Sequence, residues 1–289
     1  MRVHVAGTGK MGLPMARLLQ GGGHVLSISD PDPERLRLAR AEGLEVMASD
    51  AGIAAAECIL SSLPHDAAFL DFGGRVVRHA RRGALYVDTS TVSQQASAHV
   101  GGLCAGAGVR HVRATVSGNS HMAEVAQLTV MASGPREAYD AALPLLRLLG
   151  PQHFWLGEGE QARLMKLVVN LMIVQTSAML AEALALGRKG GLGWQDMLRV
   201  LAASAVGSPI LKAKAVQLAE RDFSPTFTVE QMLKDVALIL DAGAQARVPL
   251  PLTAATGQLL QAAMAQGSAG EDYAAIIKAV ERASDLPDL

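Results

Sequence analysis

The chain has 289 residues, enough for one large domain or two of ordinary size. Half of its residues are apolar but only 3% are aromatic, so Leu, Val, Ala and Met must fill a sizeable core. The formal net charge of −1 argues against a general binder of nucleic acid or of anionic membranes.

The chain starts with a short β-run over Arg2–Ala6, followed directly by the glycine-rich loop GTGKMG at Gly7–Gly12. A helical pattern comes next, and a second β-run over His24–Ser29 leads to Asp30. This order of strand, G-x-G-x-x-G, helix, strand and acid spans about 30 residues, as the dinucleotide-binding fingerprint requires. The segment therefore predicts a nucleotide-binding fold.

Each glycine of the loop has its own physical role in such a site. Gly7 allows the tight turn, Gly9 lets the backbone approach a pyrophosphate, and Gly12 lets the helix pack on the strand. Free N–H groups at the start of the helix attract the anion. Lys10 and Met11 lie between these glycines, and we predict that they also contact the cofactor.

Asp30 stands where a carboxylate accepts hydrogen bonds from the ribose hydroxyls of the adenosine and repels a 2′-phosphate. Pro31 follows it, rather than an arginine that would suit a 2′-phosphate. We therefore expect NAD in preference to NADP. Alternatively, Asp30 caps the helix that starts at Pro33, for which Asp-Pro-Asp-Pro is also a good signal.

Strands and helices then alternate up to residue 156, which is typical of a Rossmann-type, doubly wound parallel sheet. The predicted strands are Cys58–Ser62, Leu85–Asp88, Val109–Thr115, Leu128–Ala132 and His153–Leu156, and the predicted helices are Glu34–Ala41, Ala67–His79, Val92–Ala105 and Ala138–Leu149. Ligands bind such sheets at the carboxyl ends of the strands. The loops with Leu63-Pro64 and with Thr89, Ser90 and Thr91 lie there.

The β signal disappears after Gly157, and helices separated by Gly, Pro and Ser follow. They are predicted over Gln161–Lys189, Gly193–Ala203, Ser208–Arg221, Thr228–Ala244, Leu252–Gln266 and Asp272–Ala283. We therefore expect an NAD-binding domain over residues 1–157 and an all-helical domain for substrate binding and dimerisation over residues 158–289. A long interdomain helix should join them.

That long helix is apolar nearly all round, yet it contains Lys166 and Asn170 four residues apart and thus on one face. Its length would allow a membrane span. The polar residues Lys166, Asn170, Gln175 and Glu182 favour a helix buried in protein instead.

The N-terminus does not have the pattern of a signal peptide, because its apolar run is short and glycines follow at once. Cys58 and Cys104 form no C-x-x-C and are interpreted as buried thiols of a reducing compartment. We therefore expect a cytoplasmic protein.

Five motifs occur in a fixed order along the chain. They are GTGKMGLPMA at residues 7–16, VDTSTV at residues 87–92, Val116-Ser117-Gly118, Lys166-x-x-x-Asn170, and Phe227 with Lys234-Asp235. Together they resemble the β-hydroxyacid dehydrogenase family, which includes 3-hydroxyisobutyrate dehydrogenase, and the resemblance covers almost the whole chain.

Some positions depart from the family's pattern. Arg113-Ala-Thr115 stands where the family usually has Asp-Ala-Pro, and Asn119 replaces a glycine shortly before His121. Glu160 and Ala162 also fill positions that the family tends to keep as glycine. We expect these changes to affect the choice of substrate and to leave the chemistry intact.

The resemblance implies hydride transfer between NAD(H) and the hydroxyl-bearing carbon of a small 3-hydroxy acid or its semialdehyde. Lys166 would be the general acid and base, since an apolar surrounding eases the release of its proton. Asn170 would hold Lys166 or the substrate hydroxyl by hydrogen bonds. The alternatives are a lysine that snorkels from a helix start and an asparagine in a contact between helices.

Ser117 and the N–H groups around Gly118, with Asn119 beside them, would hold the substrate carboxylate. Thr91 would contact both substrate and cofactor, and Lys234 would bring positive charge to the nicotinamide or the substrate. The alternatives are an ordinary Ser-Gly turn, a helix N-cap in competition with the neighbouring serines, and a lysine on a helix surface.

Two other functions stay open. An imine or unusual carbonyl reductase on the same scaffold is favoured by Asn119 and His121, but Lys166 counts against it because such relatives usually replace the lysine. A non-catalytic NAD(H)-binding sensor is the other, against which Lys166 and Asn170 count. The eight histidines form no metal-spaced cluster, so we predict no metal. The apolar helix predicts a homodimer or homotetramer.

Overall fold

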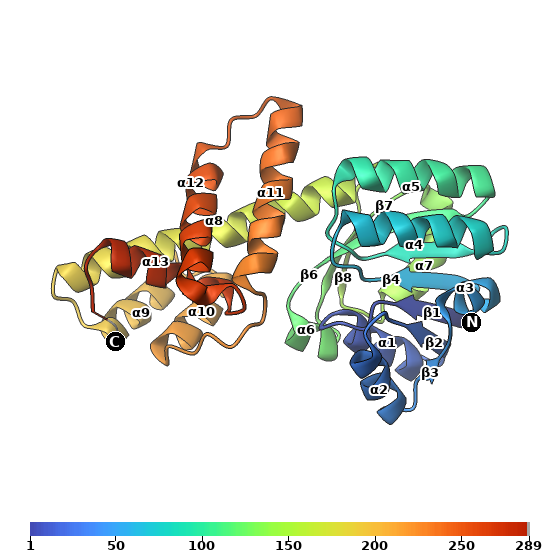
Figure 1. Cartoon of the computed structure of the whole chain (residues 1–289), viewed down its shortest axis with the longest axis horizontal. Coiled ribbons are helices and arrows are strands. Elements are labelled where there is room, and N and C mark those ends of the chain that lie inside the picture. Colours follow the sequence, from blue (N-terminus) through green and yellow to red (C-terminus); the bar gives the residue numbers. More distant parts are fainter. Residues whose placement is uncertain (288–289) are drawn as a thin grey trace. The chain divides into compact units, whose positions relative to one another are not determined.

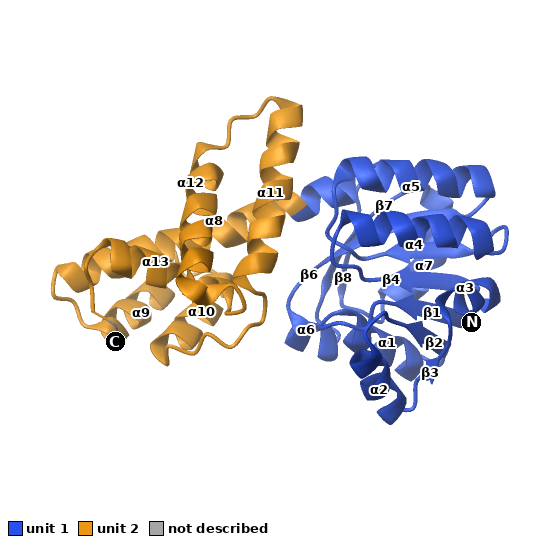
Figure 2. Cartoon of the chain, viewed as in Figure 1, with its two compact units in different colours: residues 1–166 blue, residues 167–289 orange. Residues whose placement is uncertain are grey.

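The computed structural model describes residues 1–287. The chain divides into two compact units, residues 1–166 and residues 167–289, which Figure 2 shows in different colours. The first unit contains a sheet flanked by helices and the second is helical, which confirms the predicted fold class. We describe the two units in turn.

Unit 1 is built on an eight-stranded sheet with helices on both faces (Figure 1). The strand order is β3-β2-β1-β4-β5-β6-β7-β8, so its direction reverses between β1 and β4, as in doubly wound folds. The strands are β1 (Arg2–Ala6), β2 (Val25–Ser29), β3 (Glu45–Val46), β4 (Cys58–Ser61), β5 (Leu85–Asp88), β6 (Arg110–Ser117), β7 (Thr129–Ser133) and β8 (Gln152–Trp155).

The β6–β7 pair differs from the fully parallel sheet that the sequence predicts, because these strands run antiparallel. The other neighbouring strands of the sheet are parallel. The link between β6 and β7 contains only the short helix α6 (Ser120–Glu124), and a parallel neighbour needs a longer crossover. The prediction is wrong here because strand periodicity does not encode strand direction.

The remaining helices of unit 1 are α1 (Gly12–Gly21), α2 (Pro33–Ala41), α3 (Ser49–Ala55), α4 (Asp66–His79), α5 (Gln94–Ala107) and α7 (Arg136–Leu146). The sequence does not predict α3, α6 or β3, since each is too short for a periodic pattern. Side chains of β1 alternate between the two faces of the sheet. Val3 and Val5 pack in one core with residues of α1, whereas Ala6 packs in a second core with residues of α4 and α5.

Unit 2 consists of helices, and its first helix starts within unit 1. The elements are α8 (Gln161–Lys189), α9 (Trp194–Ala203), α10 (Pro209–Ala219), α11 (Val229–Ala246), α12 (Pro251–Ala263), the π-helical turn η1 (Met264–Ser268), the 3₁₀ turn η2 (Tyr273–Ala275) and α13 (Ile276–Ala283). Val174 and Leu184 of α8 belong to the same core as Met232 and Val236 of α11.

Helix α8 is long and apolar enough to cross a membrane by length and composition alone. Of an 18-residue apolar stretch of this helix, 44% is buried inside the chain. Five of its buried residues, Val174, Ala178, Leu180, Ala181 and Leu184, belong to the core of unit 2. The exposed part includes Met165, Met172, Met179 and Leu186, which are spaced seven residues apart.

Candidate active site

The loops after β1, β2, β4, β5 and β6 lie at one edge of the sheet, because these strands are parallel. These loops and strand ends contain the residues of unit 1 that the sequence predicts for the cofactor and the substrate carboxylate. The carboxyl edge of the sheet is therefore the part of unit 1 to consider in detail.

The glycine-rich loop has the conformation that the fingerprint predicts. Gly7 has a φ of +84°, and a Cβ there would overlap the carbonyl oxygen of Ser62. A Cβ on Gly12 would overlap the carbonyl oxygen of Gly7, so the turn also requires glycine at that position. The guanidinium of Arg35 lies over Gly9, where Nη1 would be 2.8 Å from an added Cβ. The exposed Lys10 lies in the same loop.

Asp30 is bound to the glycine-rich loop. Its Oδ2 accepts hydrogen bonds from the N–H (2.7 Å) and the hydroxyl (3.1 Å) of Thr8, and its Oδ1 accepts from the N–H of Asp32 (2.9 Å). Asp32 caps α2, since its side chain accepts from the N–H of Glu34. The capping alternative for Asp30 is therefore wrong. Nη1 of Arg35 lies 3.8 Å from Oδ2 of Asp30, so a cation stands beside this acid.

A serine ties the loops after β4 and β5 together. The N–H of Leu63, which precedes Pro64, donates to Oγ of Ser90 (2.8 Å), and that hydroxyl donates to Oδ1 of Asp88 (2.7 Å). Ser93 caps α5, because its hydroxyl accepts the N–H of the residue three positions further on. The sequence offers the N-cap of this helix as an alternative role for Thr91. Ser93 takes that position, and Thr91 is half-buried.

The end of β6 leads into a glycine turn and a capped helix. Ser117 is the last residue of the strand, and Gly118 has a φ of +138°, which favours glycine. The side chain of Asn119 accepts the N–H of Met122 (2.9 Å) and is the N-cap of α6. Asn119 therefore has a structural role here, because it starts the short helix that exposes His121.

Two departures from the family's pattern meet as an ion pair. The guanidinium of Arg113 on β6 binds the carboxylate of Glu160, and both side chains are largely buried. The fully buried Ala162 also contacts the sheet: its carbonyl accepts the hydroxyl of Thr115 (3.0 Å) and its N–H donates to Oγ of Ser133 (3.2 Å). These contacts anchor the start of α8 on β6 and β7, and this is what Glu160 and Ala162 do in the structure.

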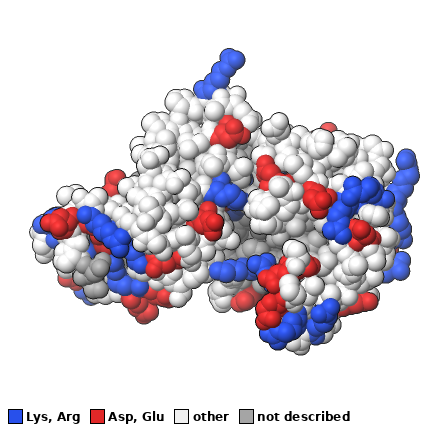
Figure 3. All heavy atoms as spheres, viewed as in Figure 1, with Lys and Arg blue, Asp and Glu red and all other residues white. Residues whose placement is uncertain are grey.

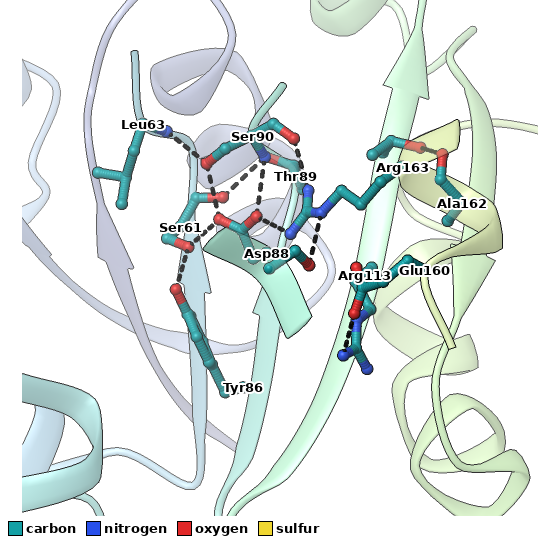
Figure 4. A network of polar contacts seen from close by, with 12 residues as sticks. Ser61, Leu63, Tyr86, Asp88, Thr89, Ser90, Arg113, Glu160, Ala162 and Arg163 are labelled. Atoms are coloured by element: carbon teal, nitrogen blue, oxygen red, sulfur yellow. Dashed lines mark hydrogen bonds and ion pairs between the residues drawn. The ribbon is translucent and has the colours of Figure 1, made fainter. Parts of the chain in front are cut away.

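A second, fully buried ion pair joins Arg163 of α8 to Asp88 at the end of β5 (Figure 4). Arg163 also donates from Nη1 to the carbonyl oxygen of Ser90 (2.5 Å) and from Nε to Oγ of Ser97 (3.1 Å). Asp88 accepts a further hydrogen bond from the hydroxyl of Ser61. Neither Arg163 nor Asp88 is among the residues that the sequence predicts for the site. An arginine in an apolar helix was the available signal, since a buried cation requires partners.

Lys166 lies about one turn after Arg163 and is half-buried. Asn170, one turn further on, is buried and donates from Nδ2 to Oδ2 of the buried Asp235 on α11 (2.5 Å). Nζ of Lys234 lies 2.9 Å from the other oxygen of Asp235. Asp235 thus joins Asn170 to Lys234, and the contact between helices that the sequence offers as an alternative for Asn170 is confirmed. The sequence predicts no role for Asp235.

Charges of both signs are interspersed on the face of the molecule in Figure 3. This matches a formal net charge close to zero.

Comparison with known proteins covers both units. Residues 2–157 match the family model described as the NAD binding domain of 6-phosphogluconate dehydrogenase, and residues 160–280 match the one described as NAD-binding of NADP-dependent 3-hydroxyisobutyrate dehydrogenase. The 2-(hydroxymethyl)glutarate dehydrogenase of Eubacterium barkeri is 30% identical, with 98% of this chain and 95% of that protein covered.

Two further proteins are similar over much of the chain. Glyoxylate/succinic semialdehyde reductase 1 of Arabidopsis thaliana is 30% identical, with 72% of each chain covered. Among solved structures, the 3-hydroxyisobutyrate dehydrogenase of Mycobacterium tuberculosis with L-serine has a TM-score of 0.88 at 27% identity, covering 96% of this chain and 98% of that one.

Proposed function

The chain belongs to the β-hydroxyacid dehydrogenase family of NAD(P)-dependent oxidoreductases, and we propose that it transfers a hydride between NAD(H) and a small 3-hydroxy acid or its semialdehyde. The observation that carries the proposal is the arrangement on α8: Lys166 and Asn170 lie one turn apart, and Asp235 holds Asn170. The names of two relatives support the substrate class, since one acts on a hydroxymethyl diacid and the other on a semialdehyde.

The glycine-rich loop and Asp30 would hold the nicotinamide cofactor, which would supply the redox chemistry of hydride transfer. Lys166 would take the hydroxyl proton during oxidation and return it to the carbonyl oxygen during reduction. Asn170 donates its amide hydrogen to Asp235, so its amide oxygen is the atom suited to accept from Lys166 or from the substrate hydroxyl. Asp235 would thus set the orientation of the amide.

The substrate carboxylate would bind at the end of β6, where the Ser117 hydroxyl and the N–H of Gly118 can donate to it. Thr91, in the loop after β5, would contact both reactants. Lys234 would add positive charge close to the reacting atoms, and its pairing with Asp235 would fix the position of that charge.

The glycine-rich loop fits a pyrophosphate, because Gly7 and Gly12 have the backbone geometry that such a turn requires. We propose NAD as the preferred cofactor, since the carboxylate of Asp30 would repel a 2′-phosphate and its Oδ1 can still accept a ribose hydroxyl. Arg35, beside Asp30, would moderate this preference through its positive charge.

The test uses the purified full-length protein with NAD and with NADP, and a panel of 3-hydroxy acids and semialdehydes. We expect turnover of at least one member, and Lys166→Ala should lower kcat by about 10²- to 10⁴-fold, the usual contribution of a general acid–base. Asp235→Asn tests the orientation of Asn170 by a KM-against-kcat comparison. The proposal fails if no member of the panel turns over with either cofactor, or if Lys166→Ala retains full activity.

We also propose that the chain forms at least a dimer through α8. Met165, Met172, Met179 and Leu186 are exposed at seven-residue spacing, which suits packing against another helix. Light scattering at micromolar concentration should show more than one copy, and Met172→Glu combined with Met179→Glu should shift the protein towards a monomer. A monomeric wild-type protein would contradict this proposal.

A further inference from the structure

A buried guanidinium links the start of α8 to the loop after β5 (Figure 4). Arg163 binds the carboxylate of Asp88, the carbonyl oxygen of Ser90 (2.5 Å) and the hydroxyl of Ser97 on α5 (3.1 Å). The side chains of Arg163 and Asp88 are both 0% exposed. A planar guanidinium can reach three acceptors at once, whereas the ammonium of a lysine is a compact point charge.

The acceptors of Arg163 are themselves fixed. Asp88 ends β5 and accepts hydrogen bonds from the hydroxyls of Ser61, on β4, and Ser90. The guanidinium also lies over the ring of Phe69 on α4, at 5.4 Å from its centre. A buried polar network with its groups satisfied is rigid. The loop after β5 and the first turn of α8 are therefore held in one arrangement.

We propose that Arg163 is a positioning residue, which fixes the loop that carries Thr91 relative to the helical turn that carries Lys166. This inference rests on the proposed function, in which Thr91 and Lys166 contact the reactants. Arg163 acts through its neighbours, because its guanidinium is enclosed by Asp88, Ser90 and Ser97.

The variant that tests the proposal is Arg163→Lys, which keeps a positive charge near Asp88 but has no donors at the separate positions of Nε, Nη1 and Nη2. Arg188→Lys is the matched control, at the other end of the same helix. Arg188 also binds a buried carboxylate, that of Glu281, and a backbone carbonyl, that of Pro287 (2.7 Å). Both substitutions thus remove the same kind of contact from α8.

Two measurements separate positioning from stability. Amide hydrogen exchange of Thr89 and Ser90, in protein without cofactor, should speed up in Arg163→Lys and stay at the wild-type rate in Arg188→Lys. A misplacement on the order of 1 Å costs up to about 100-fold in rate, so kcat should fall about 10- to 100-fold in Arg163→Lys alone. The dissociation constant of NADH, from fluorescence titration, should change by a smaller factor than kcat, because Thr91 is only one of the proposed cofactor contacts.

Ser97→Ala provides a milder second variant, because it removes only the acceptor of Nε and should still fold. It should raise the exchange of the same two amides to a smaller extent. Unchanged exchange at Thr89 and Ser90 in both Arg163→Lys and Ser97→Ala, or an equal loss of kcat in Arg163→Lys and Arg188→Lys, would overturn the proposal. If the wild-type protein turns over no hydroxy acid, the proposed function fails, and the exchange measurement still decides whether Arg163 fixes the loop.

Discussion

Unit 1 and unit 2 each contain a buried carboxylate paired with a buried cation, and the two pairs are built differently. In unit 1 the cation is the link between elements, because Arg163 on α8 reaches a carboxylate at the end of β5, a carbonyl in the loop after β5 and a hydroxyl on α5. In unit 2 the carboxylate is the centre. Asp272 accepts from Nζ of Lys214 (2.5 Å), from the N–H (3.1 Å) and hydroxyl (2.7 Å) of Thr226, and from the N–H of Ala274 (3.0 Å).

This difference follows from the chemistry of the two cations. The guanidinium has five donors in a rigid plane, so it can join several segments of chain, whereas an ammonium has three donors around one point. Lys214 binds Asp272 and Gln217 and lies 4.1 Å from the centre of the Tyr273 ring. The comparison therefore teaches that the cation joins separate elements in unit 1, whereas the carboxylate gathers the donors in unit 2.

The largest expected effect concerns the centre of the pair in unit 2. Asp272→Ala leaves Lys214 buried without its charge partner and frees the donors of Thr226 and Ala274, so the free energy of unfolding should fall by about 3–5 kcal/mol. Lys214→Met keeps those donors bound to Asp272 and should cost less. Denaturant unfolding measures both. A larger loss in Lys214→Met than in Asp272→Ala would break the comparison.

A control is available within unit 2. Lys278 and Glu271 form an ion pair at 2.7 Å in which both side chains are partly exposed (24% and 35%). Such pairs contribute about 0–1 kcal/mol because water screens them. Lys278→Met should therefore leave the free energy of unfolding nearly unchanged.

The second prediction separates the units by pH. In unit 1, burial and then the charge of Arg75 lower the pKa of His4 to about 4. The unfolded chain takes up a proton below the ordinary pKa of 6.5, whereas folded His4 stays neutral. Unit 1 should therefore lose stability as the pH falls from about 6.5 to about 4, by about 1.4 kcal/mol per pH unit.

Unit 2 should lose stability only at a lower pH than unit 1. Burial raises the pKa of Asp272, but the charge of Lys214 and the hydrogen bonds outweigh this effect, so the pKa lies below its ordinary value of 3.8. The stability that this carboxylate contributes is present above pH 3.8 and is lost only as the pH falls through the lower folded value.

The two tryptophans allow this difference to be measured, because Trp155 lies in unit 1 and Trp194 in unit 2. Denaturant unfolding is followed by tryptophan fluorescence at pH 7 and pH 5. Trp194→Phe leaves only the probe in unit 1, and Trp155→Phe leaves only the probe in unit 2. The midpoint should drop more for the probe in unit 1, and His4→Gln should reduce that drop. Equal drops at both probes would mean that the units unfold as one.

The third prediction concerns a pair whose cation is open to water. Arg35 is half exposed (49%) beside the nearly buried Asp30, so Arg35→Gln should change the free energy of unfolding by less than about 1 kcal/mol. Its effect should appear in cofactor choice instead. The ratio of kcat/KM with NAD to that with NADP should rise several-fold, on the order of 1 kcal/mol, because a cation that attracts a 2′-phosphate is lost. An unchanged ratio would contradict a role of Arg35 in cofactor choice.

The smallest effect concerns the cysteines, which are both in unit 1. Cys58 and Cys104 are free and buried, and burial raises the pKa of each thiol to about 12. A thiol reagent at pH 8 should therefore label the native protein only as fast as unit 1 opens. Rapid labelling without denaturant would show that unit 1 opens more readily than its core suggests.

The local features of the site could be predicted from sequence, and the long-range ones could not. Gly7, Gly12 and Asp30 lie within one strand–helix–strand segment, so the spacing of residues is sufficient. Arg163 and Asp88 are 75 positions apart, and no local pattern specifies which buried carboxylate an arginine will find. The cap at Asn119 follows known rules for helix starts, but α6 has only five residues and gives no periodic pattern by which to place it.

The two departures at Arg113 and Glu160 illustrate the same limit. Each is unusual alone, and their pairing across 47 positions explains both. Similarly, the sequence contains the strands β6 and β7 but not their relative direction, which the length of the link between them decides.

The position of α8 in the chain also bears on how such a protein can be recombined with its relatives. A gene fusion joined near residue 158 would take Lys166 and Asn170 together from the second parent, so the acid–base pair would be inherited intact. The ion pair of Arg163 with Asp88 would be divided between the parents, and so would that of Glu160 with Arg113. A chimera should therefore fold well only if both parents carry matching partners at these four positions, which makes α8 an unfavourable place to exchange one half of the protein for another.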